Sequence, residues 1–377
     1  MEPPRQPSPR APGTWRIGQI GGIDVLVRSS WLLVAVLISV TLSDRIDQVA
    51  PGLGSLKYVA GLAFAVLLYL SVLLHELSHA LVAKRFGMKV SSVTLHFLGG
   101  VTEIEGEAES ARNEFWISVV GPLTSLAVGA AALVATYAMP GGLLLFTCQA
   151  LAGANIVVGA LNLVPGLPLD GGRVLRAAVW AISGRPLMAT QVAGWAGRVV
   201  AVAALAYPLM LSHVVGISPN IMDFFLAGVI ALFLWAGASQ ALVSARLRKK
   251  MPSIVARALA RRALAVPSET PLGEALRRAR DAAAGGLVVL DVDGQPSGLV
   301  NEQAVLATPE ARRPWLSAGS VARRLEPGLT LPADLTGEAL ISAMQRNPAS
   351  EYLLVELDGS VFGVLVTSDV DQAFVGQ

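Results

Sequence analysis

Two histidines and a glutamate lie within five consecutive residues of an otherwise apolar stretch of the chain. His75, Glu76 and His79 occupy the first, second and fifth positions of the segment His-Glu-Leu-Ser-His. On an α-helix this spacing puts both imidazoles on one face, where they can bind one metal ion, and the glutamate can act as general base for the metal-bound water. Ionisable groups are costly inside a membrane helix, which favours a functional role over that of buried polar residues in a helix bundle.

A catalytic zinc ion takes three protein ligands and keeps a fourth position for water, so a third ligand must come from elsewhere in the chain. Cys148 is the only cysteine, which excludes a thiolate cluster. His96 lies in a predicted hairpin, His213 lies at the far end of a later helix, and Asp170 lies between a Pro-broken segment and a Gly-Gly pair. Asp170 can also cap the helix that begins near Arg173. Beside two histidines that lack a third ligand, metal binding is favoured, and because imidazoles prefer zinc to magnesium or calcium we predict one Zn2+ per chain.

The charged residues are distributed unevenly along the chain. They make up 15% of the 377 residues, against roughly 25% in soluble globular proteins, which excludes an ordinary cytosolic enzyme and a disordered chain. The net charge of +2 provides no basic face, so no nucleic-acid partner is expected. Residues 114–245 contain seven charged side chains and residues 251–377 contain 26. The sequence therefore predicts a membrane domain followed by a soluble one.

Apolar segments of about 20 residues, the length needed to cross a lipid bilayer, predict six transmembrane helices. They cover residues 30–48, 58–83, 115–138, 142–163, 191–212 and 222–245. Between the second and third helices, apolar and polar residues alternate over 89–105, which predicts a short β-hairpin at the membrane surface. Basic clusters follow the second, fourth and sixth helices, and the positive-inside rule then places both termini and the soluble domain in the cytoplasm.

The soluble part of the chain contains an internal repeat. Leu272–Leu276 and Thr336–Leu340 share the sequence Gly-Glu-Ala-Leu at an offset of 64 residues, and two hairpin patterns recur at an offset of 65. Each unit is typical of a helix, strand, turn, strand, helix order. The predicted domains are a disordered tail at 1–14, the membrane domain at 15–245, a basic linker at 246–252, and the two repeats at 253–310 and 315–375.

The motifs of the membrane domain resemble those of the site-two protease family, which are intramembrane zinc metalloproteases. The resemblance rests on the His-Glu-Leu-Ser-His helix, on Asn162–Arg173 downstream, and on Glu114-Phe115 followed by Gly121-Pro122-Leu123 and Ser125. It covers about residues 15–245. The sequence departs from the family at Ser78 and Ser125, where the family often has glycine and asparagine, and it shows no sign of the PDZ domain that many bacterial members insert.

The resemblance implies roles for five residues. His75, His79 and Asp170 are implied to be the zinc ligands. Glu76 is implied to be the catalytic base, and Asn162 to hold the substrate carbonyl or its oxyanion. The implied activity is that of a zinc-dependent endopeptidase that cleaves within or near the transmembrane segment of membrane proteins, in regulated intramembrane proteolysis. The implied substrates are single-pass membrane proteins such as anti-sigma factors, and the implied location is the bacterial plasma (inner) membrane.

The two repeats are similar to a tandem pair of CBS domains (cystathionine-β-synthase type), which some site-two proteases carry. Such pairs commonly bind adenine nucleotides through a threonine or serine and an aspartate three residues later. The corresponding positions hold Asn301 and Ala304 in the first repeat and Val366 and Asp369 in the second, so each repeat lacks part of the pattern. Asp369 is the candidate nucleotide contact, and a helix-capping role explains it equally well. Homodimer formation or gating is therefore favoured over nucleotide sensing.

The expected fold is a polytopic α-helical membrane protein, with six transmembrane helices and a short interfacial β-hairpin, followed by a C-terminal α/β tandem CBS domain pair. Two alternative functions remain open: a membrane transporter gated by its CBS domains, and a catalytically silent membrane scaffold. Arg198 and Asp223 lie in or near the fifth and sixth predicted helices. They can pair with each other, line an access path or mark loop boundaries, and the sequence is compatible with all three roles.

Overall fold

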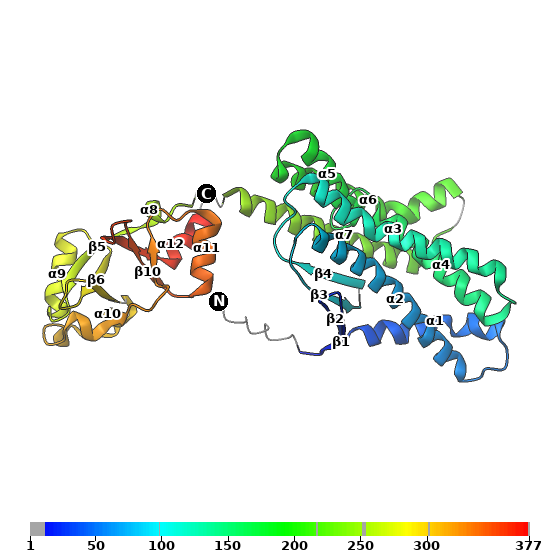
Figure 1. Cartoon of the computed structure of the whole chain (residues 1–377), viewed down its shortest axis with the longest axis horizontal. Helices are drawn as coiled ribbons and strands as arrows, with labels where there is room; N and C mark the ends of the chain where they lie inside the picture. The colour runs from blue at the N-terminus through cyan, green and yellow to red at the C-terminus, as the bar shows by residue number, and fades with distance from the viewer. Residues whose placement is uncertain (1–11, 98, 216–217, 251–253, 301, 376–377) are drawn as a thin grey trace. The chain divides into compact units, whose positions relative to one another are not determined.

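The computed structural model describes residues 12–97, 99–215, 218–250, 254–300 and 302–375. The chain divides into two compact units, Met1–Ala245 and Arg246–Gln377 (Figure 1). In chain order, the helices and strands that begin in the first unit are β1 (Thr14–Ile20), β2 (Ile23–Arg28), α1 (Trp31–Val49), α2 (Leu56–Arg85), β3 (Val90–His96), β4 (Gly99–Ile104), α3 (Ala111–Ala135), η1 (Thr136–Ala138), α4 (Gly142–Asn162), α5 (Asp170–Ser183), α6 (Pro186–Val215) and α7 (Ile221–Lys250).

Five helices of the first unit are long and apolar enough to cross a membrane. They are α2, α3, α4, α6 and α7, over Leu56–Arg85, Ala111–Ala138, Gly142–Asn162, Pro186–Leu211 and Ile221–Arg248. The prediction of six transmembrane helices is not confirmed. The first predicted segment does form a helix, α1, but Asp44, Arg45 and Asp47 near its C-terminal end make it too charged to qualify.

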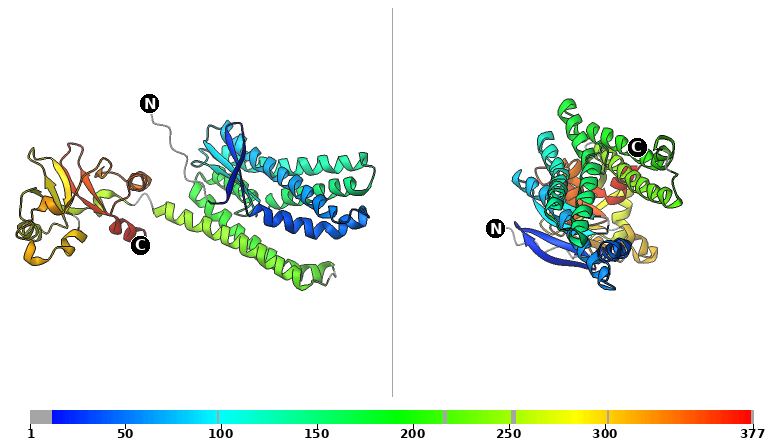
Figure 2. Two further views of the ribbon diagram at one scale, coloured as in Figure 1. Left: turned by 90° about the horizontal axis from the view of Figure 1, so that it is seen from below. Right: turned by 90° about the vertical axis from the view of Figure 1, so that its right-hand side faces the viewer.

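Helix α1 lies antiparallel along α2, to which a short loop joins it (Figures 1 and 2). The Ser39 hydroxyl donates a hydrogen bond to the Tyr58 carbonyl at 2.6 Å. A Cβ atom on Gly61 would lie 2.7 Å from the Ser39 Cα atom, so only glycine permits this approach of the two backbones. Lys57 and Asp47 form an ion pair where the two helices meet the loop.

A four-stranded sheet in the order β1-β2-β3-β4 packs against α2. Strands β2 and β3 are parallel, whereas β1 pairs with β2, and β3 with β4, in antiparallel fashion. The segment for which the sequence predicts a hairpin thus contributes β3 and β4. Strands β1 and β2 were not predicted, although the turn between them contains Gly21 and Gly22, and a Gly-Gly pair is a hairpin signal; both glycines have positive φ. Ile23 and Val25 of β2 pack in one core cluster with Leu73 of α2, close to the metal-ligating motif.

Helix α2 is the central element of the unit, because it contacts α1, α3, α4, β3 and β4. The loop at 163–169 connects α4 to α5 and packs tightly against α6. A Cβ atom on Gly197 of α6 would lie 1.9 Å from a carbonyl oxygen of this loop. Cβ atoms on Gly171 and Gly172 would lie 2.3 and 2.2 Å from its backbone atoms. The Gly-Gly pair is therefore required for α5 to begin at Asp170 directly against the loop.

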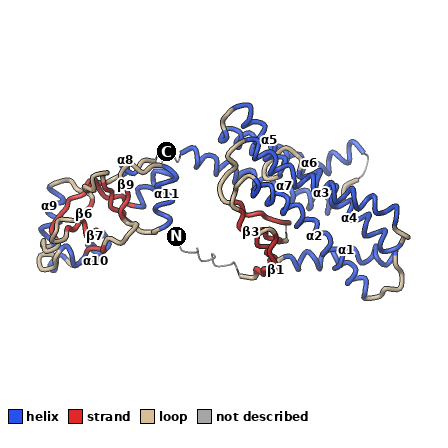
Figure 3. Tube along the Cα trace, viewed as in Figure 1, coloured by secondary structure: helices blue, strands red, loops and turns tan. Residues whose placement is uncertain are grey.

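The second unit is an α/β domain around a seven-stranded sheet in the order β8-β7-β6-β5-β11-β10-β9 (Figure 3). Its elements are α8 (Ala256–Leu259), β5 (Arg261–Pro267), α9 (Leu272–Asp281), β6 (Gly286–Leu290), β7 (Pro296–Val300), α10 (Glu302–Ala307), η3 (Glu310–Arg312), η4 (Ala318–Val321), β8 (Ala322–Arg324), β9 (Thr330–Pro332), α11 (Gly337–Arg346), β10 (Glu351–Val355), β11 (Val361–Val366) and α12 (Thr367–Val375). The order β5-α9-β6-β7 recurs as β9-α11-β10-β11, and in each half the first two strands are parallel and the last two antiparallel.

Candidate active site

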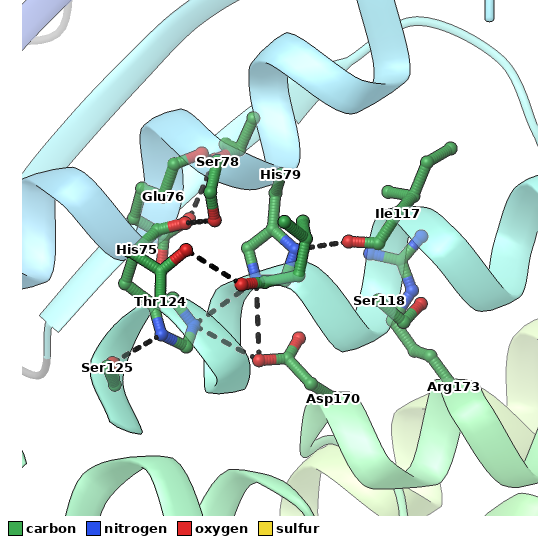
Figure 4. Close-up of polar contacts among 12 residues, drawn as sticks. His75, Glu76, Ser78, His79, Ile117, Ser118, Thr124, Ser125, Asp170 and Arg173 are labelled. Carbon is green, nitrogen blue, oxygen red and sulfur yellow. Dashed lines mark hydrogen bonds and ion pairs between the residues drawn. The ribbon is translucent and has the colours of Figure 1, made fainter. Parts of the chain in front are cut away.

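Three metal-ligating side chains meet between α2 and the beginning of α5. His75 and His79 lie one turn apart on α2, and Asp170 is the first residue of α5. Figure 4 shows both imidazoles directed toward the carboxylate. The Asp170 Oδ2 atom lies 3.1 Å from His75 Nε2 and 3.3 Å from His79 Nε2, and the two Nε2 atoms are 3.2 Å apart. The fold thus brings together the three side chains that the sequence singles out as ligands.

The separations between these atoms fit a tetrahedral zinc site. Zinc binds nitrogen and oxygen ligands at roughly 2.0–2.1 Å, so tetrahedral angles hold neighbouring ligand atoms about 3.3 Å apart. The three observed separations of 3.1, 3.2 and 3.3 Å are close to that value. Two histidines and one carboxylate also form a ligand set of catalytic zinc sites, which leave a fourth position for water. The residues present therefore fit a zinc ion.

Helix α3 orients both imidazole rings. His79 Nδ1 donates a hydrogen bond to the Ile117 carbonyl, and His75 Nδ1 lies 2.9 Å from the Ser125 hydroxyl oxygen. Because a carbonyl oxygen can only accept, the proton of the neutral His79 ring is on Nδ1, and the lone pair on Nε2 is available to a metal. Ser125 can accept from His75 in the same way. Such partners fix the tautomer and direction of a ligating histidine.

Gly121 lies between these two partners on the same face of α3, four residues from each. A Cβ atom at this position would lie 2.2 Å from His79 Nε2 and 2.7 Å from His75 Nε2. Any side chain at position 121 would therefore occupy the space in which the two ligand atoms converge. The closeness of α3 to the cluster depends on this glycine.

An ion-pair network joins the helix that carries Asp170 to α3. Arg173 and Arg176 of α5 pair with Glu114 of α3 at 3.2 and 3.1 Å, and only 1% of the Glu114 side chain is exposed. Because an unpaired carboxylate at this depth is costly, the network holds α5 against α3. The N-cap of α5 is Leu169, and the Asp170 carboxylate contacts the imidazoles of His75 and His79, so Asp170 is not the N-cap in the structure.

Asp170 lies outside the five apolar spans, and its environment favours the ionised form. Burial alone would raise the pKa of this carboxyl group, but hydrogen bonds from His75 and His79, when their Nε2 atoms carry a proton, outweigh burial and hold the pKa well below its usual range. A carboxylate must be deprotonated to ligate a metal ion. The position therefore provides the charge state that a ligand requires.

Glu76 contacts the edge strand β4. The Thr102 hydroxyl donates a hydrogen bond to Glu76 Oε2 at 2.7 Å. A Cβ atom on Gly100 would lie 2.3 Å from Glu76 Cγ, so the absence of a side chain lets β4 approach α2 here. The glutamate is thus held by one carboxylate oxygen beside the two histidines of its own helix.

A cavity of about 570 Å³ connects these groups. Its walls come from α2, β4, α4, the loop before α5, and α7, and they include the three ligand side chains and Glu76. Asn162, the last residue of α4, lines the same cavity, as do Asn155 and Phe233. The amide predicted to bind a substrate carbonyl therefore faces the same space as the metal-ligating atoms.

The other histidines lie apart from the cluster. Among the described residues, the metal-ligating group contains only the three side chains named above. His96 is at the end of β3, where its ring contacts Phe97, and His213 is exposed in the last turn of α6.

Arg198 and Asp223 do not pair with each other: Arg198 donates to the Ser239 hydroxyl, and Asp223 accepts from the backbone N–H of Asn220 at the beginning of α7.

In the second unit, Asp369 forms an ion pair with Arg261, which neither of its two predicted roles, nucleotide contact or helix cap, anticipates. Arg261 donates to both carboxylate oxygens, from Nε to Oδ2 and from Nη2 to Oδ1, each at 2.7 Å. These hydrogen bonds hold the pKa of Asp369 below its usual range. In the first repeat Ala304 stands at the position of Asp369 and has no carboxylate, and Asn301, which corresponds to Val366, lies outside the described residues.

Five residues contact or orient the metal-ligating cluster and Glu76, and none of them was predicted from the sequence to do so: Gly100, Thr102, Ile117, Gly121 and Ser125. From the sequence, Gly121 and Ser125 stood out only as part of the family resemblance. The four-residue spacing of Ile117, Gly121 and Ser125 could have indicated a helix face that meets the two histidines, which have the same spacing. Gly100 and Thr102 carry no comparable signal.

Known proteins show the same combination of parts. A model of peptidase family M50 matches residues 63–144 and 141–206, and a model of the CBS domain matches residues 255–309. The chain is 32% identical over 368 residues to a Mycobacterium tuberculosis protein named "Putative zinc metalloprotease Rip3", covering 94% of this chain and 91% of that protein. It is 27% identical to "Putative zinc metalloprotease sll0528" of Synechocystis, covering 94% of both chains. The solved site-2 protease of Methanocaldococcus jannaschii is 28% identical, covering 61% of this chain and 95% of that one, with a TM-score of 0.42.

These matches confirm the resemblance drawn from the motifs and favour a protease over the transporter and scaffold alternatives. The matches to the M. tuberculosis and Synechocystis proteins extend over nearly the whole length of both chains, including the second unit. Zinc is the metal of these relatives, and the cluster described above fits it. The chain belongs to peptidase family M50, the site-2 protease family, and is a membrane zinc metalloendopeptidase with a CBS domain.

Proposed function

We propose that the protein is an intramembrane endopeptidase in which His75, His79 and Asp170 bind the zinc ion and Glu76 is the catalytic base. The observation that carries the proposal is the convergence of three metal-ligating atoms on a helix long and apolar enough to cross a membrane. His75 lies ten residues before Arg85, the last residue of α2, which is about 15 Å along the helix axis. Ligands at this depth are within reach of a peptide bond in a transmembrane segment.

The side chains around the cavity supply the proton transfers and the hydrogen bonds of peptide hydrolysis. A bound zinc ion supplies a lowered pKa for a water ligand and positive charge beside the substrate carbonyl. The Glu76 carboxylate accepts a proton from the attacking water as its oxygen adds to the carbonyl carbon. Glu76 then gives the proton to the amide nitrogen as the C–N bond breaks, which leaves a carboxylic acid and an amine, and transfer of the acid proton to the amine gives the carboxylate and the ammonium product. The Asn162 amide donates a hydrogen bond to the carbonyl oxygen while that oxygen is negatively charged.

Strand β4 is proposed to bind the substrate in extended form. A helical substrate hides its carbonyls in hydrogen bonds, so it must unwind before hydrolysis. In the described sheet β4 pairs on one side with β3, and its other edge is open to an added strand. Gly100 and Thr102 of β4 contact Glu76, which supports strand addition next to the catalytic base.

The active site and both termini are proposed to lie on the cytoplasmic side of the bacterial plasma membrane. Lys84 and Arg85 end α2, and Arg246 and Arg248 lie near the end of α7. Both helices run toward the side of the first unit where the sheet lies (Figure 2). Basic residues at that side support a cytoplasmic location by the positive-inside rule. Single-pass membrane proteins, with anti-sigma factors as the class to test, are the proposed substrates.

The soluble unit is proposed to be a pair of CBS domains that dimerises or gates the protease. The recurrence of the β5-α9-β6-β7 order in β9-α11-β10-β11 supports a second domain of the same kind. Both carboxylate oxygens of Asp369 already accept hydrogen bonds from Arg261, which supports a structural role for this residue over contact with a nucleotide.

The test is cleavage of a tagged single-pass substrate coexpressed with variants of the full chain. Glu76→Gln is expected to abolish cleavage while one zinc ion per chain is retained, because the glutamate is not a ligand. His79→Ala is expected to lose both zinc and cleavage. Glu105→Gln, at an exposed position near the end of β4, is the matched control and should cleave like the wild type. Cleavage by Glu76→Gln at the wild-type rate would overturn the assigned mechanism.

A second experiment identifies the substrate. Full-length Glu76→Gln protein should hold its substrate without hydrolysing it, so affinity purification is expected to recover an uncleaved single-pass membrane protein that the wild type releases. Recovery of the same proteins, in the same amounts, with both forms would contradict the assignment of this cavity as the substrate site.

A further inference from the structure

Arg198 is a single positive charge inside an apolar pair of helices. It is the only charged residue between 186 and 211, the apolar span of α6. Its neighbour α7 contains no charged residue from 224 to 245. A charged side chain in such a segment is costly unless an opposite charge or a polar group meets it, and a role in binding is then the first expectation.

The contacts of the Arg198 guanidinium are aromatic on both sides. Its central carbon lies 4.8 Å from the ring centroid of Trp195 and 4.8 Å from that of Trp235. One terminal nitrogen donates to the Ser239 hydroxyl at 3.1 Å, and the buried Nε has no hydrogen-bond partner. In the described part of the chain no carboxylate forms an ion pair with this guanidinium. The protein therefore holds the group in place without neutralising its charge.

The two tryptophans beside Arg198 are exposed on the outer surface of the helix pair. Trp195 and Trp235 are 55% and 44% exposed, on helices that are apolar enough to lie in lipid. Tryptophan is enriched where the hydrocarbon meets the headgroups. Ser239 lies seven residues before Arg246, or about 10 Å along α7, so Arg198 is close to the basic end of the helix pair. A surface at this level is covered by phospholipid, which offers a phosphate for the cation and acyl chains for the exposed rings.

We propose that Arg198, Trp195, Trp235 and Ser239 form a binding site for the phosphate of an anionic phospholipid at the seam between α6 and α7. The phosphate accepts hydrogen bonds from the guanidinium, and the acyl chains lie over the two indole rings. The site is on the same turn of α6 as Gly197, which packs against the loop that leads to Asp170. A bound lipid thus braces the pair of helices on which that loop rests.

The test measures lipid binding rather than proteolysis, so its outcome does not depend on the proposed function. The full chain in detergent micelles is titrated with palmitoyl-oleoyl phosphatidylglycerol, and the rise in melting temperature is followed. Palmitoyl-oleoyl phosphatidylcholine and sodium phosphate are titrated in parallel. The phosphatidylglycerol is expected to raise the melting temperature at lower concentration than the phosphatidylcholine. Sodium phosphate is expected to have no effect, since it has no acyl chains for the indole rings, and an equal effect of sodium phosphate would overturn the assignment to a lipid.

Variants locate the effect. Arg198→Gln is expected to raise the phosphatidylglycerol concentration for the half-maximal shift about tenfold, as for the loss of a charge-assisted hydrogen bond. Arg246→Gln removes one positive charge at the same end of the helix pair and is expected to keep the wild-type midpoint within about twofold. Ser239→Ala keeps the charge and should weaken binding by a smaller factor, which preserves the test if Arg198→Gln does not fold. A wild-type midpoint for Arg198→Gln, or for Ser239→Ala if Arg198→Gln does not fold, would refute the site.

Discussion

Replacement of Gly121 by alanine tests the packing of α3 against the zinc ligands. A Cβ atom at this position would lie 2.2 Å from His79 Nε2, 2.5 Å from His79 Cε1 and 2.7 Å from His75 Nε2. Ordinary contacts of a Cβ atom begin at 3.4 Å, so the His79 ring has to move by about the difference between 3.4 and 2.2 Å, roughly 1 Å. Metal–ligand distances tolerate about 0.2 Å. The substitution should therefore remove His79 from the coordination sphere.

The expected loss of zinc affinity can be estimated from the known effect of milder changes at zinc sites. Loss of a hydrogen-bond partner behind a ligand costs 10- to 100-fold in metal affinity, and displacement of the ligand itself should cost about 100-fold or more, or about 2.7 kcal/mol. Alanine is the better helix former by about 1 kcal/mol, so helix propensity acts in the opposite direction and cannot explain a loss. Gly153→Ala in α4 is the matched control, since no heavy atom lies within 4 Å of its added Cβ.

The assay is zinc affinity of the purified full-length protein, measured by competition with a chromophoric chelator. Zinc content per chain after gel filtration serves as a second readout. Gly153→Ala should bind one zinc ion with wild-type affinity, and Gly121→Ala should lose zinc under the same conditions. An affinity of Gly121→Ala within threefold of the wild type would refute both the assigned ligands and the close approach of α3.

Three further predictions concern the hydrogen bonds of individual side chains. Thr102→Val removes the hydrogen-bond donor to Glu76 and should lower kcat about 10-fold with little change in KM. Thr102→Ser keeps the hydroxyl and should retain the wild-type rate. Equal rates for the two variants would exclude a role for the hydroxyl. Ser125→Ala leaves Nδ1 of His75 without its partner and should weaken zinc binding about 10- to 100-fold, measured by the same competition assay. Arg261→Gln should weaken the fall in the melting temperature of the full chain at acid pH, measured by calorimetry. The pKa of Asp369 is lowered in the folded state, so its contribution to the free energy of unfolding is present above pH about 4 and is lost as the pH falls further. The same fall in melting temperature in the variant and the wild type would contradict this linkage.

The proposed metal ligands could be predicted from the spacing of two histidines and from the isolated position of one carboxylate. His75 and His79 must share a helix face at four-residue spacing, and Asp170 stood out in a nearly uncharged background between a Pro-broken segment and two glycines. The groups that orient these ligands could not be predicted in the same way. The Ile117 partner is a backbone carbonyl, which every residue has, and the role of Gly121 depends on how closely α3 approaches α2.

The prediction of elements met similar limits. Long apolar runs predicted the five candidate spans, whereas the sixth was not confirmed because the charges of α1 lie within the helix and do not end it. Strands β1 and β2 were missed, since β1 is largely exposed and has little hydrophobic periodicity, and β2 is only six residues long although Ile23 and Val25 alternate on its buried face. What stabilises them is pairing with β3, which is remote in the sequence.

Residue types and spacing alone were enough to predict a metal site of two histidines and one carboxylate, to propose Glu76 as the base, and to predict a membrane part followed by a more highly charged part. These features depend on residue types, on spacing within one helix and on the distribution of charge, all of which are local. Only the tertiary structure decided which side chains orient the ligands, that Thr102 of an edge strand holds Glu76, and that Asp369 pairs with Arg261. Each of these contacts joins segments that are far apart in the chain, and the packing of the whole unit determines their separation.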